Sequence, residues 1–524
     1  MPRASLWPEI EGPWDVLIIG GGITGAGILR LASLAGLKAL LVEQHDFSSG
    51  TSSRSSKLVH GGLRYLRQGH FRVTRQSVAE RERLIREAPG LVYPLDFLLP
   101  VYQGQGGRRA AYRLGLYLYD LLAGRKTRFS LSRREFACRV PALGSAGLEG
   151  GLGYQDALAD DARLVLRLIF ESLAAGGRAI NYACAKTLLF DSSGSVCGAV
   201  IADQASGATA EARARVVINA AGAWVDQIRG RLGRPPVIRP LRGSHLVFPH
   251  RALPVNQGIT FPHPRDRRPV FVLPWEGVTL VGTTDLDQRS GLAADPVISA
   301  GERDYLLSAL EAYFPDLRPA AQNIMATFCG IRPVVGGGHR NPSRETRDML
   351  ILDERGLLTV TGGKLTTFRL LALKALAAAG KRLNLDAADL AAKAVYTPPG
   401  ASLLPGTGTE EGRLYGRYGP AARQLVEEAG AAEMRPIPGS PYLWAELKYA
   451  ARHEMACHLD DLLLRRLRLG LLLPGGGAGL LDSLKEVILP AMGWDQHRWQ
   501  AECARYLEIW NRSYSPTGKG DHSR

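Results

Sequence analysis

Residues 15–43 read DVLIIGGGITGAGILRLASLAGLKALLVE, and this stretch decides the fold of the N-terminal part of the chain. The apolar runs 15–20 and 38–43 are typical of buried parallel strands. Between them, apolar side chains recur at helical spacing in residues 21–36, and Gly36 suits the end of that helix. A strand, a helix and a strand in this order form a βαβ unit, the building block of an α/β fold.

Glycines mark the turn from the first strand into the helix. Gly20, Gly22 and Gly25 fit the pattern G-x-G-x-x-G. Glycine permits a sharp turn and a close approach of backbone to a pyrophosphate, and the helix N-terminus offers N–H donors. Glu43 ends the second strand, 18 positions after Gly25, close to the spacing expected of a ribose-binding acid. These residues predict a dinucleotide site; the alternative is a tight strand–helix turn without a ligand.

Later segments bear on the choice between NAD and FAD. The next glycine-marked strand ends are VINAAGA at 217–223, which contains Gly222, and TGGKLT at 361–366, which contains Gly363 and Thr366. A nucleotide-binding domain that is split along the chain, with another domain inserted, is the common layout of flavoproteins. We therefore expect FAD.

A serine-rich segment follows the second strand and reads SSGTSSRSSKLVHGGLRYL at 48–66. The hydroxyls of Ser52, Ser53 and Ser56 could bind the pyrophosphate. His60 could exchange a proton near neutral pH, and Arg64 could hold an anion. The alternatives are a linker, a structural histidine and a surface arginine, and they lose weight because the segment lies close to the predicted cofactor turn.

Composition bounds the class of protein. The chain has 524 residues, with 65 Lys and Arg against 50 Asp and Glu, so its net charge is +15. Hydrophobic residues are 45% and charged residues 22%, near globular averages, which excludes disordered and fibrous classes. The positive charge favours anionic partners: phosphorylated metabolites, acidic lipids or nucleic acid. Six cysteines without a CxxC pair, no signal-peptide pattern and no apolar run of spanning length predict a reduced, cytoplasm-facing protein. His453 and His458 stand five apart, so no metal site is expected.

The C-terminal part has a different composition. Residues 398–412 are rich in Pro and Gly and predict a linker, followed by a helical domain at 413–512. Within it, residues 444–469 carry apolar side chains at three- and four-residue steps and predict a strongly helical stretch. Residues 513–524 predict a frayed tail.

Taken together, the motifs resemble those of the FAD-dependent respiratory (aerobic) glycerol-3-phosphate dehydrogenases. The segments that carry the resemblance are GGGITGAGI (20–28), SSKLVHGGLRYL (55–66), DDARLV (160–165), NAAGAW (219–224), GSHLVFP (243–249), VGTTD (281–285), GIRPV (331–335), ETRDML (345–350), GGKLTTFR (362–369) and ELKYAARHE (446–454). The resemblance implies an α/β fold with three parts. They are a discontinuous Rossmann-type FAD-binding domain, an inserted sheet-containing substrate domain and an all-α C-terminal domain. The oxidoreductase region is expected at 14–397, with FAD-binding segments at about 14–75, 155–230 and 340–385.

The resemblance also implies residue roles. The family's phosphate-binding arginines fall on Arg64, Arg332 and Arg347. Its active-site positions near the reacting carbon fall on His60, His245 and Lys364, and Lys364 sits at an expected helix N-terminus. Arginine suits phosphate because its planar fork donates two parallel hydrogen bonds.

The implied reaction is oxidation of sn-glycerol 3-phosphate to dihydroxyacetone phosphate, with electrons passed from FAD to membrane quinone. Alternatives are an oxidase that reduces oxygen to hydrogen peroxide, and an amine or amino-acid oxidase of the same fold. Nucleic acid is not expected, because aromatic and basic residues are not interleaved in the way of an RNA-binding surface. A homodimer is compatible with the sequence. We expect peripheral attachment to the inner face of the cell membrane, where residues 111–128 form either an interfacial helix or an ordinary buried one.

Overall fold

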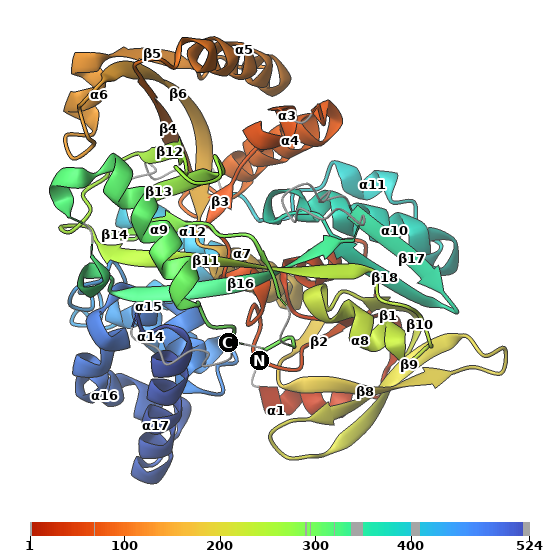
Figure 1. Cartoon of the computed structure of the whole chain (residues 1–524). Helices are drawn as coiled ribbons and strands as arrows, with labels where there is room; N and C mark the ends of the chain where they lie inside the picture. The colour runs from red at the N-terminus through yellow and green to blue at the C-terminus, as the bar shows by residue number, and fades with distance from the viewer. Residues whose placement is uncertain are drawn as a thin grey trace.

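Two β-sheets and a C-terminal helical unit make up the molecule (Figure 1). The computed structural model describes residues 3–67, 69–288, 291–293, 295–318, 320–336, 349–399 and 409–516. Within them, no helix has the length and apolar character needed to cross a membrane.

The first sheet is built on the predicted βαβ unit. Its strands lie in the order β17 (Met349–Glu354), β18 (Leu357–Gly362), β10 (Thr209–Asn219), β1 (Pro13–Ile19), β2 (Ala39–Val42) and β7 (Arg178–Ile180), and β9 (Val196–Asp203) joins β10 to β8 (Ala183–Phe190). The strands from β18 to β7 are parallel, whereas β17 is antiparallel to β18. Because the chain returns to this sheet from three distant segments, the predicted discontinuous α/β domain is confirmed.

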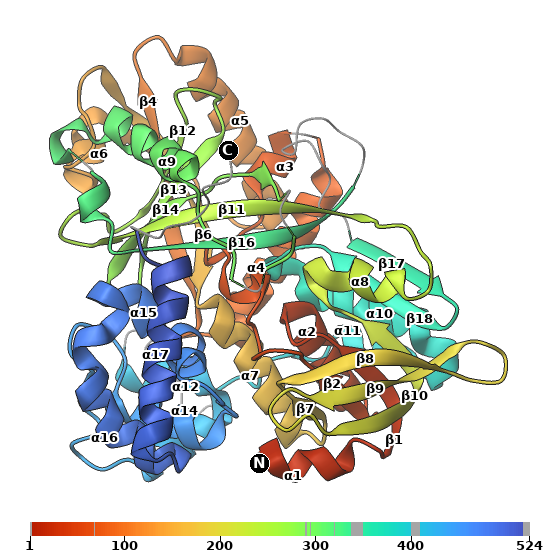
Figure 2. The same cartoon turned by 60° about the horizontal axis from the view of Figure 1, so that its bottom comes forward.

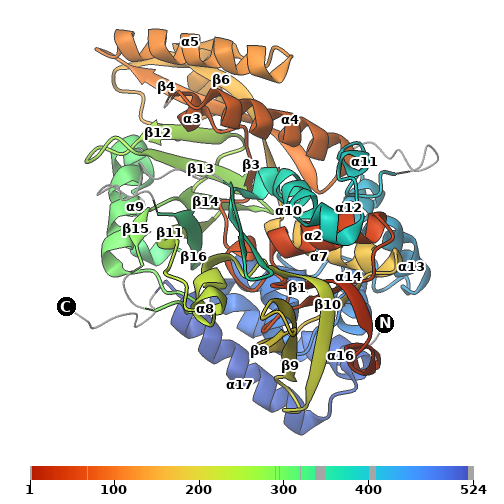
Figure 3. The same ribbon diagram turned by 90° about the vertical axis from the view of Figure 1, so that its right-hand side faces the viewer.

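Helices cover this sheet because parallel strands are apolar on both faces. The helix α2 (Ile23–Leu34) packs between α7 (Asp161–Ala174) and α10 (Phe368–Leu383), as Figure 3 shows. A Cβ on Gly27 of α2 would lie only 2.7 Å from the Phe368 ring of α10. Short helices complete this half of the molecule: α1 (Arg3–Leu6), α8 (Val225–Gly230) and α11 (Ala388–Ala391).

The second sheet is mostly antiparallel. Its strands lie in the order β15 (Leu286–Asp287), β11 (Ile238–Pro249), β14 (Val278–Gly282), β13 (Pro269–Trp275), β12 (Gly258–Pro262), β4 (Val92–Tyr102), β6 (Leu148–Ala159) and β3 (Leu58–Val59); β16 (Ala326–Val335) pairs with β11, and β5 (Phe129–Ser132) with β6. Its helices are α3 (Leu63–Arg67), α4 (Phe71–Glu87), α5 (Gly106–Ala123), α6 (Arg133–Arg139) and α9 (Ala300–Tyr313). The strand β3 belongs to this sheet although it falls within the predicted FAD-binding segment 14–75, because Leu58 and Val59 pair with β6.

The C-terminal unit is helical in the part of it that the structure describes. Its helices are α12 (Glu410–Tyr418), α13 (Ala422–Glu427), α14 (Trp444–His453), the π-helical turn η10 (Asp461–Arg466), α15 (Leu469–Leu472), α16 (Leu481–Met492) and α17 (Gln496–Ser513). The helices pack on the second sheet, with which they share one hydrophobic cluster that includes Trp275, Phe328 and Leu463 (Figure 2).

The predicted helical stretch 444–469 is divided into shorter helices. The helix α14 ends at His453, Met455 has a φ of +50°, and η10 starts at Asp461. The helix breaks because the Asp461 carboxylate accepts hydrogen bonds from the backbone N–H groups of Cys457 and His458, at 2.7 and 2.9 Å. This contact begins a new helical turn rather than continuing the old one.

Two predicted boundaries at the C-terminal end also shift. The helix α12 starts at Glu410, inside the predicted linker 398–412, because the Thr409 hydroxyl accepts a hydrogen bond from Gly412 N at 3.2 Å. Residues 400–408 of that linker lie outside the described residues. The predicted frayed tail is wrong for its first residues, since Tyr514 is buried and its carbonyl accepts a hydrogen bond from Thr327 N at 2.7 Å.

Candidate functional site

A cavity of about 760 Å³ lies between the two sheets. It is lined by all three glycine-marked strand ends of the first sheet, at Gly20, Gly222 and Gly363. From the second sheet come His245 of β11 and Arg332 of β16. The predicted cofactor turn and the predicted substrate side chains therefore meet in one space. The other predicted site residues that line it are Gly22, Glu43, Ser52, Ser56, His60, Lys364 and Thr366.

The glycine turn has the shape of a dinucleotide cradle. Gly20 has a φ of +119°, and a Cβ there would lie 2.6 Å from Ala220 O at the end of β10. A Cβ on Gly25 would come within 1.9 Å of Gly20 O, so Gly25 supports the turn although it does not line the cavity. Gly22 caps α2 without a side-chain hydrogen bond, which leaves the positive end of the helix facing the cavity. These residues fit the pyrophosphate of FAD.

The loop 43–57 closes over this turn. Glu43 Oε2 accepts a hydrogen bond from Gly21 N at 2.7 Å, and Glu43 Oε1 accepts one from His45 N at 2.8 Å. Burial raises the pKa of the Glu43 carboxyl, and these two bonds partly oppose that shift. Ser52 Oγ accepts a hydrogen bond from Ile23 N at 2.9 Å and so joins the loop to the start of α2.

Two other serines of this loop face different ways. Ser56 Oγ lies 2.8 Å from His245 Nε2, so this hydroxyl joins the loop to the second sheet. Ser53 is buried and is not among the residues that line the cavity. Its carbonyl accepts hydrogen bonds from Lys57 Nζ and Arg468 Nη2, each at 2.7 Å. The role of Ser53 as a cofactor ligand stays a prediction.

His245 is held by stacking and by strand register. Its ring lies parallel to Phe328, with centroids 4.6 Å apart, because the two residues face each other across β11 and β16. Gly282 pairs with His245 on the other side, and a Cβ there would lie 2.3 Å from His245 Cδ2. Burial lowers the pKa of His245 well below its ordinary value, and the charges of Arg332 and Lys57 lower it further. The imidazole is therefore neutral at pH 7.

Arg332 lies on β16, four residues beyond Phe328, and its guanidinium is held by hydrogen bonds. It donates to Thr283 Oγ1 at 2.8 Å, and to Thr284 O and Asp285 Oδ1 at 3.1 Å each. A Cβ on Gly243 would lie 2.1 Å from Arg332 Nη2, so a larger residue there would displace the guanidinium from this position. The arrangement presents a planar, oriented cation to the cavity.

The remaining side chains of the site follow Gly363, at the junction between β18 and α10. Lys364 Nζ lies 3.2 Å from Ser77 Oγ and 3.6 Å from the centroid of the Tyr65 ring. Thr366 Oγ1 accepts a hydrogen bond from His60 N at 3.1 Å and donates one to His60 O at 3.2 Å. The backbone at His60 is thereby held to the start of α10.

Two predicted arginines are not placed. Arg64 belongs to α3, but its side chain is not described, and Arg347 lies outside the described residues. Both stay predictions.

Several residues of the site were not predicted from the sequence. Asp285, Thr283, Gly243 and Gly282 were not singled out, although VGTTD and GSHLVFP carried the resemblance. The two glycines matter only because β11, β14 and β16 are paired in this register, and that pairing is not a local property of the sequence.

Comparisons with known proteins agree with this geometry. The family model described as "FAD dependent oxidoreductase" matches residues 15–377, and "C-terminal domain of alpha-glycerophosphate oxidase" matches residues 405–499. The chain is 34% identical over 481 residues to "Aerobic glycerol-3-phosphate dehydrogenase" of Staphylococcus haemolyticus, and 35% identical over 483 residues to that of Staphylococcus saprophyticus, with 86% of each chain covered in both cases.

Solved structures resemble it as well. The glycerol-3-phosphate dehydrogenase from Bacillus halodurans complexed with FAD has a TM-score of 0.76 at 26% identity over 99% of each chain. L-alpha-glycerophosphate oxidase from Mycoplasma pneumoniae has a TM-score of 0.56 at 17% identity, covering 71% of this chain and 95% of that one, which shows a shared fold. FAD is the cofactor of this protein, and the chain belongs to the FAD-dependent oxidoreductases and, within them, to the family of the aerobic glycerol-3-phosphate dehydrogenases.

Proposed function

We propose that the protein oxidises sn-glycerol 3-phosphate at C2 to dihydroxyacetone phosphate and passes the electrons to membrane quinone. The observation that carries the first part is the shared cavity, in which the glycine turn faces Arg332 and His245. The substrate named for its relatives supports the same reading. FAD, when bound, supplies the acceptor for the hydride that leaves C2.

Cationic side chains around the cavity favour a phosphate over a carboxylate. Among the described residues, seven arginine and lysine side chains line it, including Arg332, Arg268 and Lys364, against the three carboxylates of Glu43, Asp156 and Asp285. Asp285 orients Arg332. Arg268 Nη2 also lies 3.5 Å from Asp285 Oδ2. A phosphate monoester carries a charge of about −1.5 to −2 at pH 7, so a surplus of cations suits it better than a single carboxylate. We assign the phosphate to Arg332, with Arg64 and Arg347 as further proposed contacts.

His245 is our general base. A neutral, buried imidazole that stacking and a hydroxyl hold in place can accept the C2 hydroxyl proton. Binding of the phosphate next to Arg332 offsets one of the positive charges that lower the pKa of His245, so the proton becomes easier to hold when substrate is present. Lys364 and His60 position substrate and cofactor in this proposal, since both line the cavity.

The proposals for the electron acceptor and for the membrane-contacting surface depend on helix α5. Leu114, Tyr117 and Leu121 are 62%, 51% and 67% exposed and lie on one face of the helix. Figures 1 and 3 show α5 at the outer edge of the molecule. Arg108 and Leu114 also line the cavity, so the apolar face adjoins it. We propose that this face rests on an anionic membrane surface, at the inner side of the cell membrane, where quinone is available.

Oxygen is the second candidate acceptor. The C-terminal part matches a family named for an oxidase. Stoichiometric hydrogen peroxide at a rate equal to that of quinone reduction would favour it.

Arg332→Ala tests the phosphate assignment. Anaerobic mixing of the wild type with sn-glycerol 3-phosphate should bleach the flavin absorbance, whereas glycerol should not. The variant should keep FAD and need about 10- to 100-fold more substrate for half-maximal bleaching, because a charge-assisted hydrogen bond is lost. Unchanged affinity and rate in the variant would contradict the assignment, and no bleaching of the wild type would contradict the proposed substrate.

The pH dependence tests His245 as the base. Only the neutral imidazole accepts a proton, and its pKa is lowered, so the acid limb of flavin reduction should lie below about pH 6.5, the ordinary value for histidine. His245→Gln should slow bleaching by about 10²–10⁴-fold and abolish this limb. His250→Gln, which changes a histidine outside the cavity, is the control. Flavin bleaching by His245→Gln at the wild-type rate would show that another group is the base. If His60→Gln alone slowed bleaching by the factor expected for His245→Gln, that group would be His60.

The double variant Tyr117→Asp with Leu121→Asp tests the membrane face. It should bind vesicles of anionic lipid at least about tenfold more weakly than the wild type, because two apolar contacts are lost. The rate at which it reduces a quinone analogue in the presence of vesicles should also fall. Flavin bleaching by substrate should stay at the wild-type rate. Phe190→Asp, at another exposed aromatic site on β8, is the control. A wild type that does not co-sediment with these vesicles at low salt would contradict the proposal.

A further inference from the structure

The loop 43–54 is held between the cofactor turn and the C-terminal unit. On the cofactor side, Ser48 N donates to Gly21 O at 3.0 Å, and Ser52 Oγ binds Ile23 N. His45 and residues 49–52 line the cavity. The loop therefore forms one wall of the flavin site.

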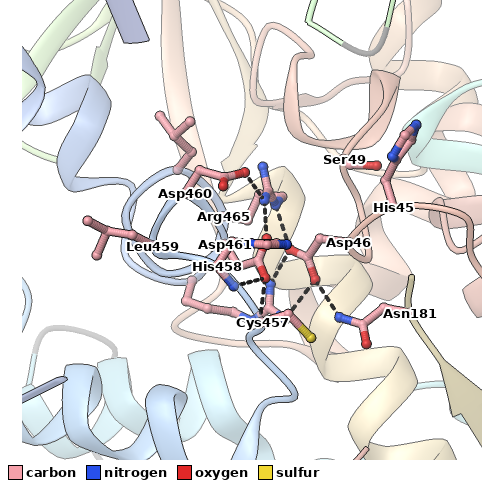
Figure 4. A network of polar contacts seen from close by, with 12 residues as sticks. His45, Asp46, Ser49, Asn181, Cys457, His458, Leu459, Asp460, Asp461 and Arg465 are labelled. Atoms are coloured by element: carbon pink, nitrogen blue, oxygen red, sulfur yellow. Dashed lines mark hydrogen bonds and ion pairs between the residues drawn. The ribbon is translucent and has the colours of Figure 1, made fainter. Parts of the chain in front are cut away.

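Asp46 turns away from the cavity toward the C-terminal unit. Figure 4 shows it facing Arg465, while the His45 side chain points in another direction. Asp46 Oδ2 accepts hydrogen bonds from Arg465 Nε and Arg466 Nη1, and Asp46 Oδ1 accepts one from Arg466 Nη2 at 2.9 Å. Asn181 Nδ2 donates to the same Oδ1 at 3.0 Å. The carboxylate is fully buried, so this contact excludes water.

Both arginines are themselves fixed within the C-terminal unit. Arg465 Nη2 donates to Asp460 Oδ2 at 2.7 Å and is also paired with Asp461. Arg466 Nη2 donates to Glu454 O at 2.7 Å. Asp461 starts the η10 turn that follows the break in the helix. The broken helix thus brings two neighbouring arginines to one carboxylate of a distant loop.

The same unit holds the loop at its other end. Arg468 Nη2 donates to Ser53 O at 2.7 Å, and Arg54 Nη2 donates to Tyr514 Oη at 2.9 Å. Burial alone would raise the pKa of Asp46, but the charges of Arg466 and Arg465 outweigh it and the pKa is lowered. The Asp46 carboxylate is therefore charged, and its neutralisation removes the buried contact that Arg465 and Arg466 share.

We propose that Arg465 and Arg466 are positioning residues for FAD, which hold the cofactor loop in its binding shape through Asp46. The C-terminal helical unit is then part of the flavin site although it lies behind the loop. By thermodynamic linkage, FAD that binds the ordered loop must also stabilise the η10 region, to the same extent that this region favours FAD. The inference concerns FAD alone and does not depend on the proposed substrate or acceptor.

Hydrogen exchange of the full-length wild type, with FAD and after its removal, is the first test. FAD should slow amide exchange in residues 457–468 as well as in residues 43–54. Slowing in residues 43–54 without any in residues 457–468 would overturn the proposal. This measurement needs no variant.

Asp46→Asn supplies the second test, with Glu446→Gln as the matched control. Glu446 is also fully buried and binds two arginines, Arg413 and Arg417, but it belongs to the C-terminal unit and does not touch the loop. In fluorescence titrations of the apoproteins, Asp46→Asn should weaken FAD binding by roughly 5- to 150-fold, the usual range for coupled sites. Glu446→Gln should keep the wild-type affinity even where it lowers Tm.

A conservative variant, Arg466→Lys, supplies the third test. It keeps the charge but loses the two-pronged contact, so its FAD affinity should lie between those of Asp46→Asn and the wild type. Wild-type FAD affinity in Asp46→Asn would overturn the proposal. An equal loss of affinity in Asp46→Asn and Glu446→Gln would also overturn it, because the effect would then be general destabilisation.

Discussion

The buried ion pair between Lys57 and Asp161 lies where the first sheet, the second sheet and the C-terminal unit contact one another. Lys57 Nζ donates to both carboxylate oxygens of Asp161, at 2.8 and 2.9 Å, and lies 4.7 Å from the centre of the Phe328 ring. Asp161 begins a helix of the first sheet, Phe328 belongs to the second sheet, and Arg468 of the C-terminal unit also binds Asp161. Burial and the neighbouring Arg468 lower the pKa of Lys57 to about 7, against the opposing attraction of Asp161. Removal of Asp161 would take from Lys57 and Arg468 the buried carboxylate that they share.

The positions of the proposed catalytic side chains depend on this ion pair through direct contacts. Phe328 contacts Lys57 and also stacks on His245, so the position of the proposed base depends on the position of this ion pair. Ser56, the residue before Lys57, carries the hydroxyl that binds the His245 ring. Arg332 lies four residues beyond Phe328 on the same strand. The proposed phosphate clamp, the proposed proton acceptor and one wall of the cavity are therefore positioned by one loop and one pair of strands.

Local sequence predicts the parts of this structure that local physics determines. The β1–α2–β2 unit, its glycine turn and Glu43 were all predictable, because hydrophobic period and glycine spacing act over a few residues. Arg332, His245 and Lys364 came only from the resemblance, and they meet because the sheets bring distant segments together. The break after His453 and the burial of Tyr514 were not predicted, since each depends on partners far along the chain or on a carboxylate cap that periodicity does not reveal. The need for glycine at positions 243 and 282 follows from strand pairing, which no local pattern encodes.

The central claim is that the cavity directs C2 of glycerol 3-phosphate, and no other carbon, to the cofactor. The most direct measurement uses sn-glycerol 3-phosphate with deuterium at C2 and follows flavin bleaching under anaerobic conditions, with mass spectrometry of the product. The account predicts slower bleaching than with the unlabelled substrate and a product that has lost the deuterium, because the C2–H bond is the one that breaks. A product that retains the deuterium would mean oxidation at another carbon and would contradict the account.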